Sequence, residues 1–370
     1  MAASASFEIF LVASPGTEAT LAAEARSLGF HAIARTTGGV TIKGGWSEIW
    51  RANLQLRGCT RVLARIGSFH AGHLAQLDKL ARKFPWKEFL KPDVPVSVEA
   101  TCHKSRIYHA GAAAQRIETA IREELGAPIA ADAPIAIKAR FEDNLCTISI
   151  DTSGESLHKR GHKTAIAKAP MRETLAAHFL QRCKFDGSEP LVDPMCGSGT
   201  FVIEAAEMAL GLMPGRARSF AFEQLANFDA HSWQHMQNDV APRASAQKFC
   251  GSDRDVGAIR MAQANAERAG VSAVAEFQRR SISDLSPPEG PPGLVIVNPP
   301  YGTRIGDKKP LLDLHATLGR VLMERFAGWR VGLVTTDTNL AKATALPFLP
   351  PDKPVNHGGL HVLLFRTRAL

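Results

Sequence analysis

A strand that ends in an acid, a glycine loop and a helix follow one another in LVDPMCGSGTFVIEAA, residues 191–206. After a buried strand the chain must turn sharply, and Gly197 and Gly199 supply the backbone angles and the close approach that such a turn needs. The helix begins near Thr200, and the free N–H groups of its first turn can face an anionic group of a ligand. The loop lacks the Lys-Ser/Thr ending of a P-loop, which disfavours hydrolysis of a nucleoside triphosphate.

Strands and helices alternate from Met171 to the C-terminus, which predicts a parallel sheet with crossover helices. After the first strand at 189–194, strands are expected at 248–253, 275–281, 293–300 and 330–337, with a hairpin over 353–368. This order predicts an open, doubly wound α/β sheet with a Rossmann-like fold, whose ligand lies beyond the carboxyl ends of the strands. Residues 211–245 show no periodicity and are expected to be irregular.

Three acids follow successive strands of this predicted sheet: Asp193, Asp253 and Asp284. A carboxylate at Asp253 can accept both hydroxyls of a ribose, and Asp284 can accept a hydrogen bond from an adenine amino group. A single acid in such a position is more often a turn residue. Three of them at the ends of neighbouring strands indicate a bound adenosine.

The segment VIVNPPYG, residues 295–302, carries a strand into Asn298-Pro299-Pro300-Tyr301. The two prolines restrict the backbone and turn Asn298 towards the cleft. An exocyclic base amine is a poor nucleophile because its lone pair is delocalised into the ring. The Asn298 side-chain oxygen and the Pro299 carbonyl can accept the protons of the amine, and Tyr301 can stack on a base flipped out of its helix. The alternative interpretation is a rigid turn that ends a strand.

The first 155 residues differ from the rest and predict a self-contained α+β unit. Residues 51–110 contain 11 Lys and Arg against 4 Asp and Glu, a balance of +7 within a chain of net charge +8. A basic patch is the expected footprint of a polyanionic partner such as RNA, although a solvated basic surface is the simpler alternative.

Several classes of protein are disfavoured by what the chain lacks. Six cysteines contain no CxxC pair, and the 13 histidines show no metal-ligand spacing, so neither a disulfide framework nor a metal site is expected. The N-terminus has no basic region of a signal peptide, and no apolar stretch approaches the ~20 residues that span a bilayer. These features predict a cytoplasmic protein without a membrane partner.

The stretch SLHKRGHKTAIAKAP, residues 156–170, joins the two halves and is rich in Lys, Arg and His. Two interpretations stay open at this point: a solvated linker, or a segment that contacts RNA directly.

The glycine-loop motif, GSDRD at 251–255 and NPPYGTRIG at 298–306 resemble the amino-methyltransferases of nucleic acids. Together with LHKRGHK at 157–163 and APMRETLAA at 169–177, they resemble more closely the THUMP-domain RNA guanine-N2 methyltransferases. The greatest similarity is to the bacterial branch that makes N2-methylguanosine in 23S ribosomal RNA. The resemblance extends over nearly the whole chain.

This resemblance implies a domain order and a set of functional residues. The domains are a ferredoxin-like part at 1–60, a THUMP RNA-binding domain at 45–155, a linker at 156–170 and a Rossmann-like methyltransferase domain at 171–370. The implied cofactor is S-adenosylmethionine, and the implied partner is RNA, bound through the basic N-terminal half. The implied cofactor-binding residues are Asp193, Pro194, Cys196, Gly197, Ser198, Gly199, Thr200, Asp253 and Asp284, and the catalytic residues are Asn298, Pro299, Pro300 and Tyr301.

Other functions remain open from the sequence. A transfer-RNA guanine-N2 methyltransferase and an adenine-N6 methyltransferase of DNA or RNA need the same tetrapeptide, as does methylation of a glutamine amide in a protein. A noncatalytic RNA-binding protein with a degenerate methylase fold is a further class, although the acids and the tetrapeptide are intact. Some members of the family carry a second methyltransferase module, which follows the point where this chain ends, and its modification is not expected here.

Overall fold

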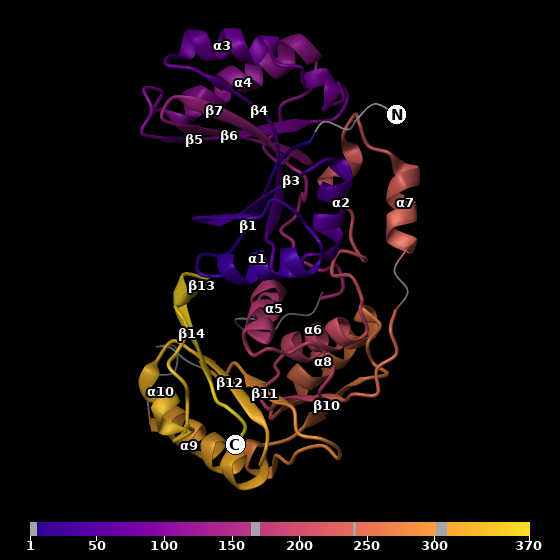
Figure 1. Ribbon diagram of the computed structural model, residues 1–370, viewed down its shortest axis with the longest axis vertical. Coiled ribbons are helices and arrows are strands. Elements are labelled where there is room, and N and C mark those ends of the chain that lie inside the picture. The colour runs from indigo at the N-terminus through magenta and orange to yellow at the C-terminus, as the bar shows by residue number, and fades with distance from the viewer. Residues whose placement is uncertain (1–5, 164–170, 240–241, 301–308) are drawn as a thin grey trace. The chain divides into compact units, whose positions relative to one another are not determined.

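The computed structural model describes residues 6–163, 171–239, 242–300 and 309–370, and these fold into two compact units (Figure 1). The first unit contains the chain up to Ala13, then Leu21–Leu157 and Arg218–Asp239. The second contains Ser14–Thr20, His158–Ala217 and Val240–Leu370. The segment Arg218–Asp239 therefore belongs to the first unit, although it lies in the second half of the sequence.

The first unit is built on a seven-stranded sheet with the order β2-β3-β1-β4-β7-β6-β5, in which only the β5–β6 pair is parallel. Its strands are β1 Phe7–Val12, β2 Ala34–Thr36, β3 Gly39–Gly44, β4 Arg61–His70, β5 Val96–His103, β6 Ile135–Glu142 and β7 Leu145–Asp151. Its helices are α1 Glu18–Ser27, α2 Trp46–Gln55, α3 Leu74–Lys83 and α4 Ala110–Leu125, and α3 and α4 lie on one face of the β5–β7 strands (Figure 1).

Strands β6 and β7 form a hairpin, with its turn at Asp143 and Asn144. Both residues have positive φ, 49° and 66°, as a two-residue hairpin turn of type I′ requires.

The segment Arg218–Asp239 is held to the first unit by aromatic side chains. Trp50 on α2 stacks on Phe222 with ring centroids 6.0 Å apart and meets the edge of Trp233 at 6.5 Å. Trp233 belongs to helix α7 (Ala230–Asn238), which begins at Asp229, a side-chain cap for the first N–H groups. The prediction that residues 211–245 are irregular is therefore wrong for α7, whose one buried side chain, Trp233, packs against Trp50, far away in the sequence.

The second unit contains a seven-stranded sheet with the order β10-β9-β8-β11-β12-β14-β13. Its strands are β8 Leu191–Asp193, β9 Phe249–Asp253, β10 Ala275–Arg279, β11 Leu294–Val297, β12 Arg330–Thr335, β13 Val355–His357 and β14 Leu360–Arg366. The first five are parallel to one another, and β14 runs antiparallel to β12. The predicted doubly wound α/β fold with an antiparallel end is confirmed.

Helices cover both faces of this sheet, and each face has its own hydrophobic core (Figure 1). One face carries α5 Glu173–Arg182, α6 Thr200–Ala209 and α8 Val256–Ala269; the other carries α9 Lys309–Arg325 and α10 Thr338–Ala343. Along β11, Leu294 and Ile296 enter the first core, and Val295 and Val297 enter the second. This alternation buries the strand on both sides, as a central parallel strand requires. No helix among the described residues is long and apolar enough to cross a membrane.

Candidate functional site at the strand ends

The strand order of the second unit reverses at its centre, between β8 and β11. From β8 the chain passes outward through β9 and β10, and then returns to form β11 on the opposite side. In open α/β sheets, ligands bind at such a switch point, beyond the carboxyl ends of the strands. Asp193 is the last residue of β8, and Asn298 comes directly after β11, so the topology brings these two predicted site residues to the same edge.

The glycine loop between β8 and α6 is tied to the end of the neighbouring strand β9. The Cys196 N–H donates to the Ser252 carbonyl at 2.9 Å, and the Gly197 N–H donates to the Asp253 carboxylate at 3.1 Å. The other Asp253 oxygen accepts the Asp255 N–H at 3.0 Å. Asp253 is thus oriented by backbone donors on both sides.

The two glycines of the loop have different reasons to be glycine. Both have positive φ, 52° at Gly197 and 86° at Gly199. A Cβ at Gly199 would lie 3.0 Å from the Phe277 ring, so this position also needs glycine for packing. A Cβ at Gly197 would meet no described atom within 4 Å, so the space above Gly197 is open to a ligand.

Asp193 is only 2% exposed, and its one recorded hydrogen bond within the described chain comes from the Met195 N–H at 3.1 Å. Burial raises the pKa of its carboxyl to about 8; the Met195 hydrogen bond lowers it, and the nearby charge of Asp253 raises it. A carboxylate with so little compensation is costly to bury unless a ligand supplies a positive or hydrogen-bonding group.

The other side chains of the predicted loop point into the protein. Pro194, Cys196, Ser198 and Thr200 are buried, and burial raises the pKa of the Cys196 thiol well above its ordinary value. Such a thiol is inert as a nucleophile. Any contact that these residues make with a ligand must therefore come mainly from the backbone, next to the open space at Gly197.

Asp284 lies on the surface at the end of a short 3-10 turn, where it accepts the Ser281 hydroxyl at 2.6 Å. It lines a hollow of about 450 Å³ that opens beyond the ends of β9 and β10. The other lining residues are Arg254, Arg279, Arg280 and Ser281. The hollow lies where the sequence predicts an adenine neighbour, but its three arginines give it more positive charge than an uncharged adenine needs.

Asn298 is partly buried, and its side-chain oxygen is fully shielded and accepts no hydrogen bond from any described residue. Pro299 is buried and Pro300 is exposed. Tyr301, the fourth predicted catalytic residue, lies outside the described residues. A shielded amide oxygen without a donor costs about 1–3 kcal/mol, so this oxygen is suited to accept a hydrogen bond from a substrate.

In the segment His158–Lys163, three side chains are buried or nearly so against helix α6, whereas Lys159 is exposed. Arg160 is 1% exposed and pairs with Glu204 at 3.4 Å. The Lys163 side chain is 11% exposed, and its ammonium donates to the Thr200 hydroxyl at 2.8 Å. The buried side chains of Arg160, His162 and Lys163 are therefore not solvated, and both interpretations stay open for the exposed Lys159. Residues 164–170, the remainder of the predicted linker, lie outside the described residues.

The same segment makes further polar contacts with α6 and α5. The His162 ring lies 3.7 Å from the Glu207 carboxylate, which also forms an ion pair with Arg216 at 2.7 Å. Lys163 forms an ion pair with Glu173 on α5 at 2.9 Å. The residues that these side chains contact on α6, Thr200, Glu204 and Glu207, lie on one face of that helix. We call the segment His158–Lys163 the α6 strap. Sequence reasoning missed the strap, although two glutamates in the apolar helix TFVIEAAEMA were a signal that cations would face them.

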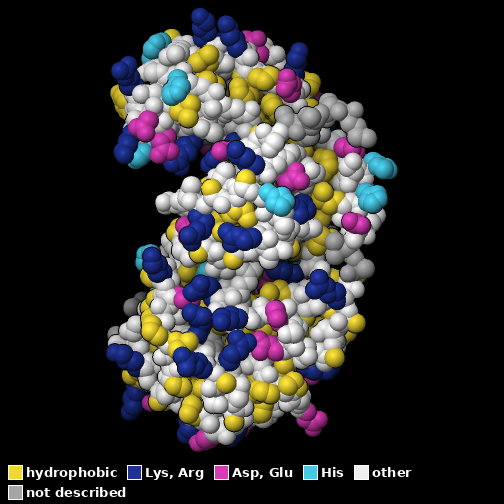
Figure 2. Space-filling model, viewed as in Figure 1, with side chains coloured by type: hydrophobic (Ala, Val, Ile, Leu, Met, Phe, Trp, Pro, Cys, Tyr) yellow, Lys and Arg dark blue, Asp and Glu magenta, His cyan; other side chains and the backbone are white. Residues whose placement is uncertain are grey.

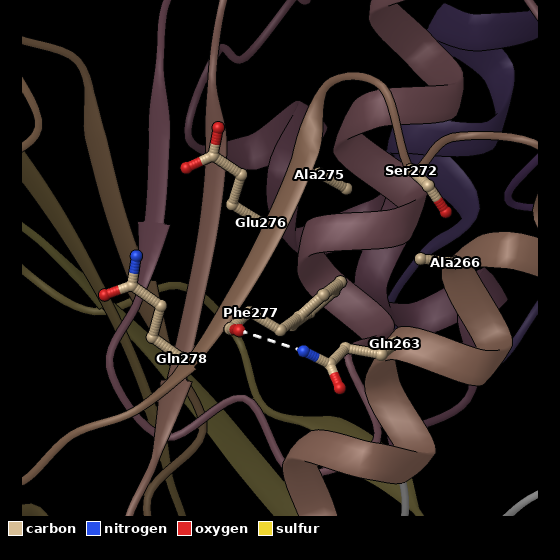
Figure 3. Close-up of a pocket in the computed structure, with 7 residues that line it drawn as sticks. All are labelled: Gln263, Ala266, Ser272, Ala275, Glu276, Phe277 and Gln278. Carbon is tan, nitrogen blue, oxygen red and sulfur yellow. Dashed lines mark hydrogen bonds between the residues drawn. The ribbon is translucent and has the colours of Figure 1, made fainter.

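A second hollow, of about 330 Å³, lies beside the edge strand β10 and is shown in Figure 3. Gln263 on α8 reaches across it and donates to the Phe277 carbonyl at 3.3 Å. Its lining contains none of the predicted site residues, so it is not a candidate for the adenosine or amine site.

Comparisons with known proteins identify the family of this chain. Residues 160–351 match the family profile of the RMKL-like methyltransferase domain, and residues 8–63 match that of the RlmL ferredoxin-like domain. A putative RNA methyltransferase of Synechocystis sp. is 32% identical over 96% of this chain and 95% of its own length. The ribosomal RNA large subunit methyltransferase K/L of Syntrophotalea carbinolica is 35% identical over 91% of this chain, which spans about half of that relative (50%).

Solved structures are similar over the whole chain. A putative methyltransferase in complex with SAH superposes with a TM-score of 0.88 at 26% identity, covering 99% of this chain and 98% of the other. A predicted N6-adenine-specific DNA methylase from Listeria monocytogenes gives a TM-score of 0.87 at 26% identity, with coverage of 99% and 97%.

Proposed function

The chain belongs to the RMKL-like methyltransferase family, and from this premise we propose that it methylates the exocyclic N2 amine of a guanosine in RNA. S-adenosylmethionine is the cofactor, and when bound it supplies an electrophilic methyl group on a sulfonium. The remaining task of the protein is to hold the donor and the amine in line, which is catalysis by position without a metal.

One observation carries the proposal: the Asn298 oxygen is shielded, has no donor among the described residues and lies beside the topological switch point. An aromatic amine that donates to this oxygen and to the Pro299 carbonyl loses part of its delocalisation into the ring. Its lone pair then becomes available for attack on the methyl group. Because Pro299 and Pro300 restrict the backbone, both acceptors are positioned before the substrate arrives.

The residues at the end of β8 and β9 suit S-adenosylmethionine. Asp253 is held by two backbone N–H groups and can accept the hydroxyls of a ribose. The open space at Gly197 lets a ligand approach the loop closely. The poorly compensated carboxylate of Asp193 fits a cationic group such as the ammonium of the methionine part.

Ribosomal RNA and guanine N2 rest on the family rather than on this geometry. The K/L relatives are named as ribosomal RNA methyltransferases, and this chain spans about half of their length. Adenine N6 is the competing target, because the acceptors treat any aromatic amine alike and because one similar structure is described as an N6-adenine-specific DNA methylase.

The experiment that tests the proposal identifies the methylated nucleoside. The purified protein is incubated with S-adenosylmethionine carrying a labelled methyl group and with 23S ribosomal RNA from a strain that lacks the corresponding gene. The RNA is then digested and its nucleosides are separated by mass spectrometry, with transfer RNA and duplex DNA as parallel substrates. We expect the label in N2-methylguanosine from ribosomal RNA. Label in N6-methyladenosine or in DNA alone would reject the proposed reaction, and label in transfer RNA alone would reject ribosomal RNA as the substrate.

A further inference from the structure

Three loops of the first unit meet at one end of its sheet. Strand β4 ends at His70 and pairs there with Leu145, where β7 begins. Strand β5 ends at His103 and pairs there with Glu142, where β6 ends. The loops at residues 70–73, 103–109 and 142–145 therefore share one edge of the fold.

Asn144 joins these loops through three hydrogen bonds. Its carbonyl accepts the Ala71 N–H at 2.9 Å, its N–H donates to the Ser105 hydroxyl at 3.0 Å, and its side-chain oxygen accepts the Arg106 N–H at 2.8 Å. Its backbone is left-handed, with φ of 66°, a conformation that asparagine tolerates better than most residues. One residue thus fixes three segments that lie far apart in the sequence.

The surface that these loops present is dominated by Tyr108, whose exposed fraction of 84% is the largest of any bulky apolar side chain in the described chain. Lys104, Arg106 and His109 are exposed in the same loop. Lys104 is also left-handed, with φ of 46°, which is uncommon for a lysine and is often found at functional sites.

Further polar side chains lie at the neighbouring strand ends, and Lys, Arg and His side chains gather with Asp and Glu at the ends of β5 and β6 in Figure 2. His70, His73, His103 and Arg140 are exposed there. The acidic residues at this edge are Asp143 and Glu142. The Glu142 carboxylate forms an ion pair with Arg140 at 2.9 Å and lies 3.7 Å from the His103 ring. We call the loops with Tyr108 and these side chains the Tyr108 surface.

An exposed aromatic ring in the same loop as Lys104 and Arg106 suits an unpaired nucleotide, because the ring stacks on the base and the two cations attract the phosphates. A double helix offers no free base face for stacking, and a protein partner would favour an apolar patch. We therefore propose that the Tyr108 surface binds a single-stranded stretch of the RNA substrate, with Tyr108 stacking on a base. This inference rests on the proposed function in that the substrate is RNA.

Binding of the full chain to a fluorescein-labelled single-stranded 12-nucleotide RNA of mixed sequence, measured by fluorescence anisotropy, tests the proposal. Loss of one base–aromatic stack corresponds to about a fivefold to hundredfold rise in Kd, so we expect a change of this size for Tyr108→Ala. Tyr108→Phe keeps the ring and should bind like the unmodified chain. A matched control is Leu360→Ala, which removes a 50% exposed apolar side chain on β14 of the other unit.

The same measurements with Asn144→Gly test the loop geometry, since glycine allows the left-handed backbone but removes the oxygen that accepts the Arg106 N–H. We expect weaker binding of the single-stranded RNA with unchanged binding of S-adenosylmethionine. An unchanged Kd for Tyr108→Ala would overturn the proposal and favour a protein partner for this surface. Equal weakening on a 12-base-pair RNA duplex would overturn the stacking mode.

This result is separable from the proposed function. If Tyr108→Ala weakens RNA binding but no RNA is methylated, the surface stands and the assigned reaction fails. If RNA is methylated and Tyr108→Ala changes neither KM for RNA nor Kd, the reaction stands and the surface fails.

Discussion

The α6 strap and the turn Asn298-Pro299-Pro300 both bring polar side chains into the second unit, but they differ in what those side chains contact. In the strap, Arg160 faces Glu204 and Lys163 faces Thr200 and Glu173. At the turn, the shielded Asn298 oxygen has no donor among the described residues. A buried polar group with a partner within the protein stabilises the fold, whereas one that lacks a partner at a strand end is available to a ligand.

Asp193 resembles Asn298 rather than the strap. It lies at the same edge of the sheet, is almost fully buried and receives one backbone hydrogen bond in the described structure. The comparison therefore predicts opposite effects on stability: removing a strap residue should destabilise the protein, and removing the charge at Asp193 should stabilise the cofactor-free protein.

The largest expected effect is on the strap. Arg160→Met leaves the Glu204 carboxylate buried without its arginine, which typically costs about 3–5 kcal/mol in the free energy of unfolding. Urea unfolding of the full chain measures this, with the exposed Lys159→Met as the control. A double variant Arg160→Met, Glu204→Leu should recover much of the loss. If Arg160→Met leaves stability unchanged and weakens RNA binding instead, the segment contacts RNA and the comparison fails.

A smaller effect, dependent on pH, is expected at Asp193. Its pKa is raised from 3.8 to about 8 in the folded chain, mainly by burial, so the folded state holds this proton to a higher pH than the unfolded state. Between about pH 4 and pH 8 this group therefore lowers the free energy of unfolding as pH rises.

Asp193→Asn removes that dependence. Without cofactor, the variant should be more stable than the unmodified chain at pH 8, and the difference should vanish towards pH 4, as thermal unfolding across this range will show. Asp186→Asn is a control of opposite sign, because hydrogen bonds from Ser188 lower the pKa of the exposed Asp186. Lower stability of Asp193→Asn at pH 8 would mean that Asp193 has a structural partner.

The strands of the sheet in the second unit could be predicted from the sequence because each is a short apolar run that ends in a polar residue. The periodicity of α9 was also present, with buried side chains at Leu311, His315, Leu318 and Leu322, but the bounds of this helix were not predicted. The strap was misinterpreted for a different reason. A run of Lys, Arg and His is usually solvated, and its partners on α6 are about forty residues away in the sequence, so only the fold shows that they meet.

The positions of the proposed site residues in the fold were predictable in part. The acids, the glycine loop and the tetrapeptide carry their own local signals, and the structure places the described ones at adjoining strand ends. Which side chains of the loop face inward could not be predicted, because Cys196, Ser198 and Thr200 are buried by packing against α8, β9 and the strap.

The central claim is that the Asn298 oxygen serves the substrate and not the fold or the cofactor. Asn298→Ala tests it most directly when S-adenosylmethionine binding by calorimetry and RNA methylation turnover are measured on the same protein, with the exposed Asn339→Ala on α10 as the control. We predict unchanged cofactor affinity and a loss of turnover of about a hundredfold or more, the typical effect of removing one preorganised hydrogen bond at a reacting group. Equal loss of cofactor binding and turnover, or turnover close to that of the unmodified chain, would contradict the claim.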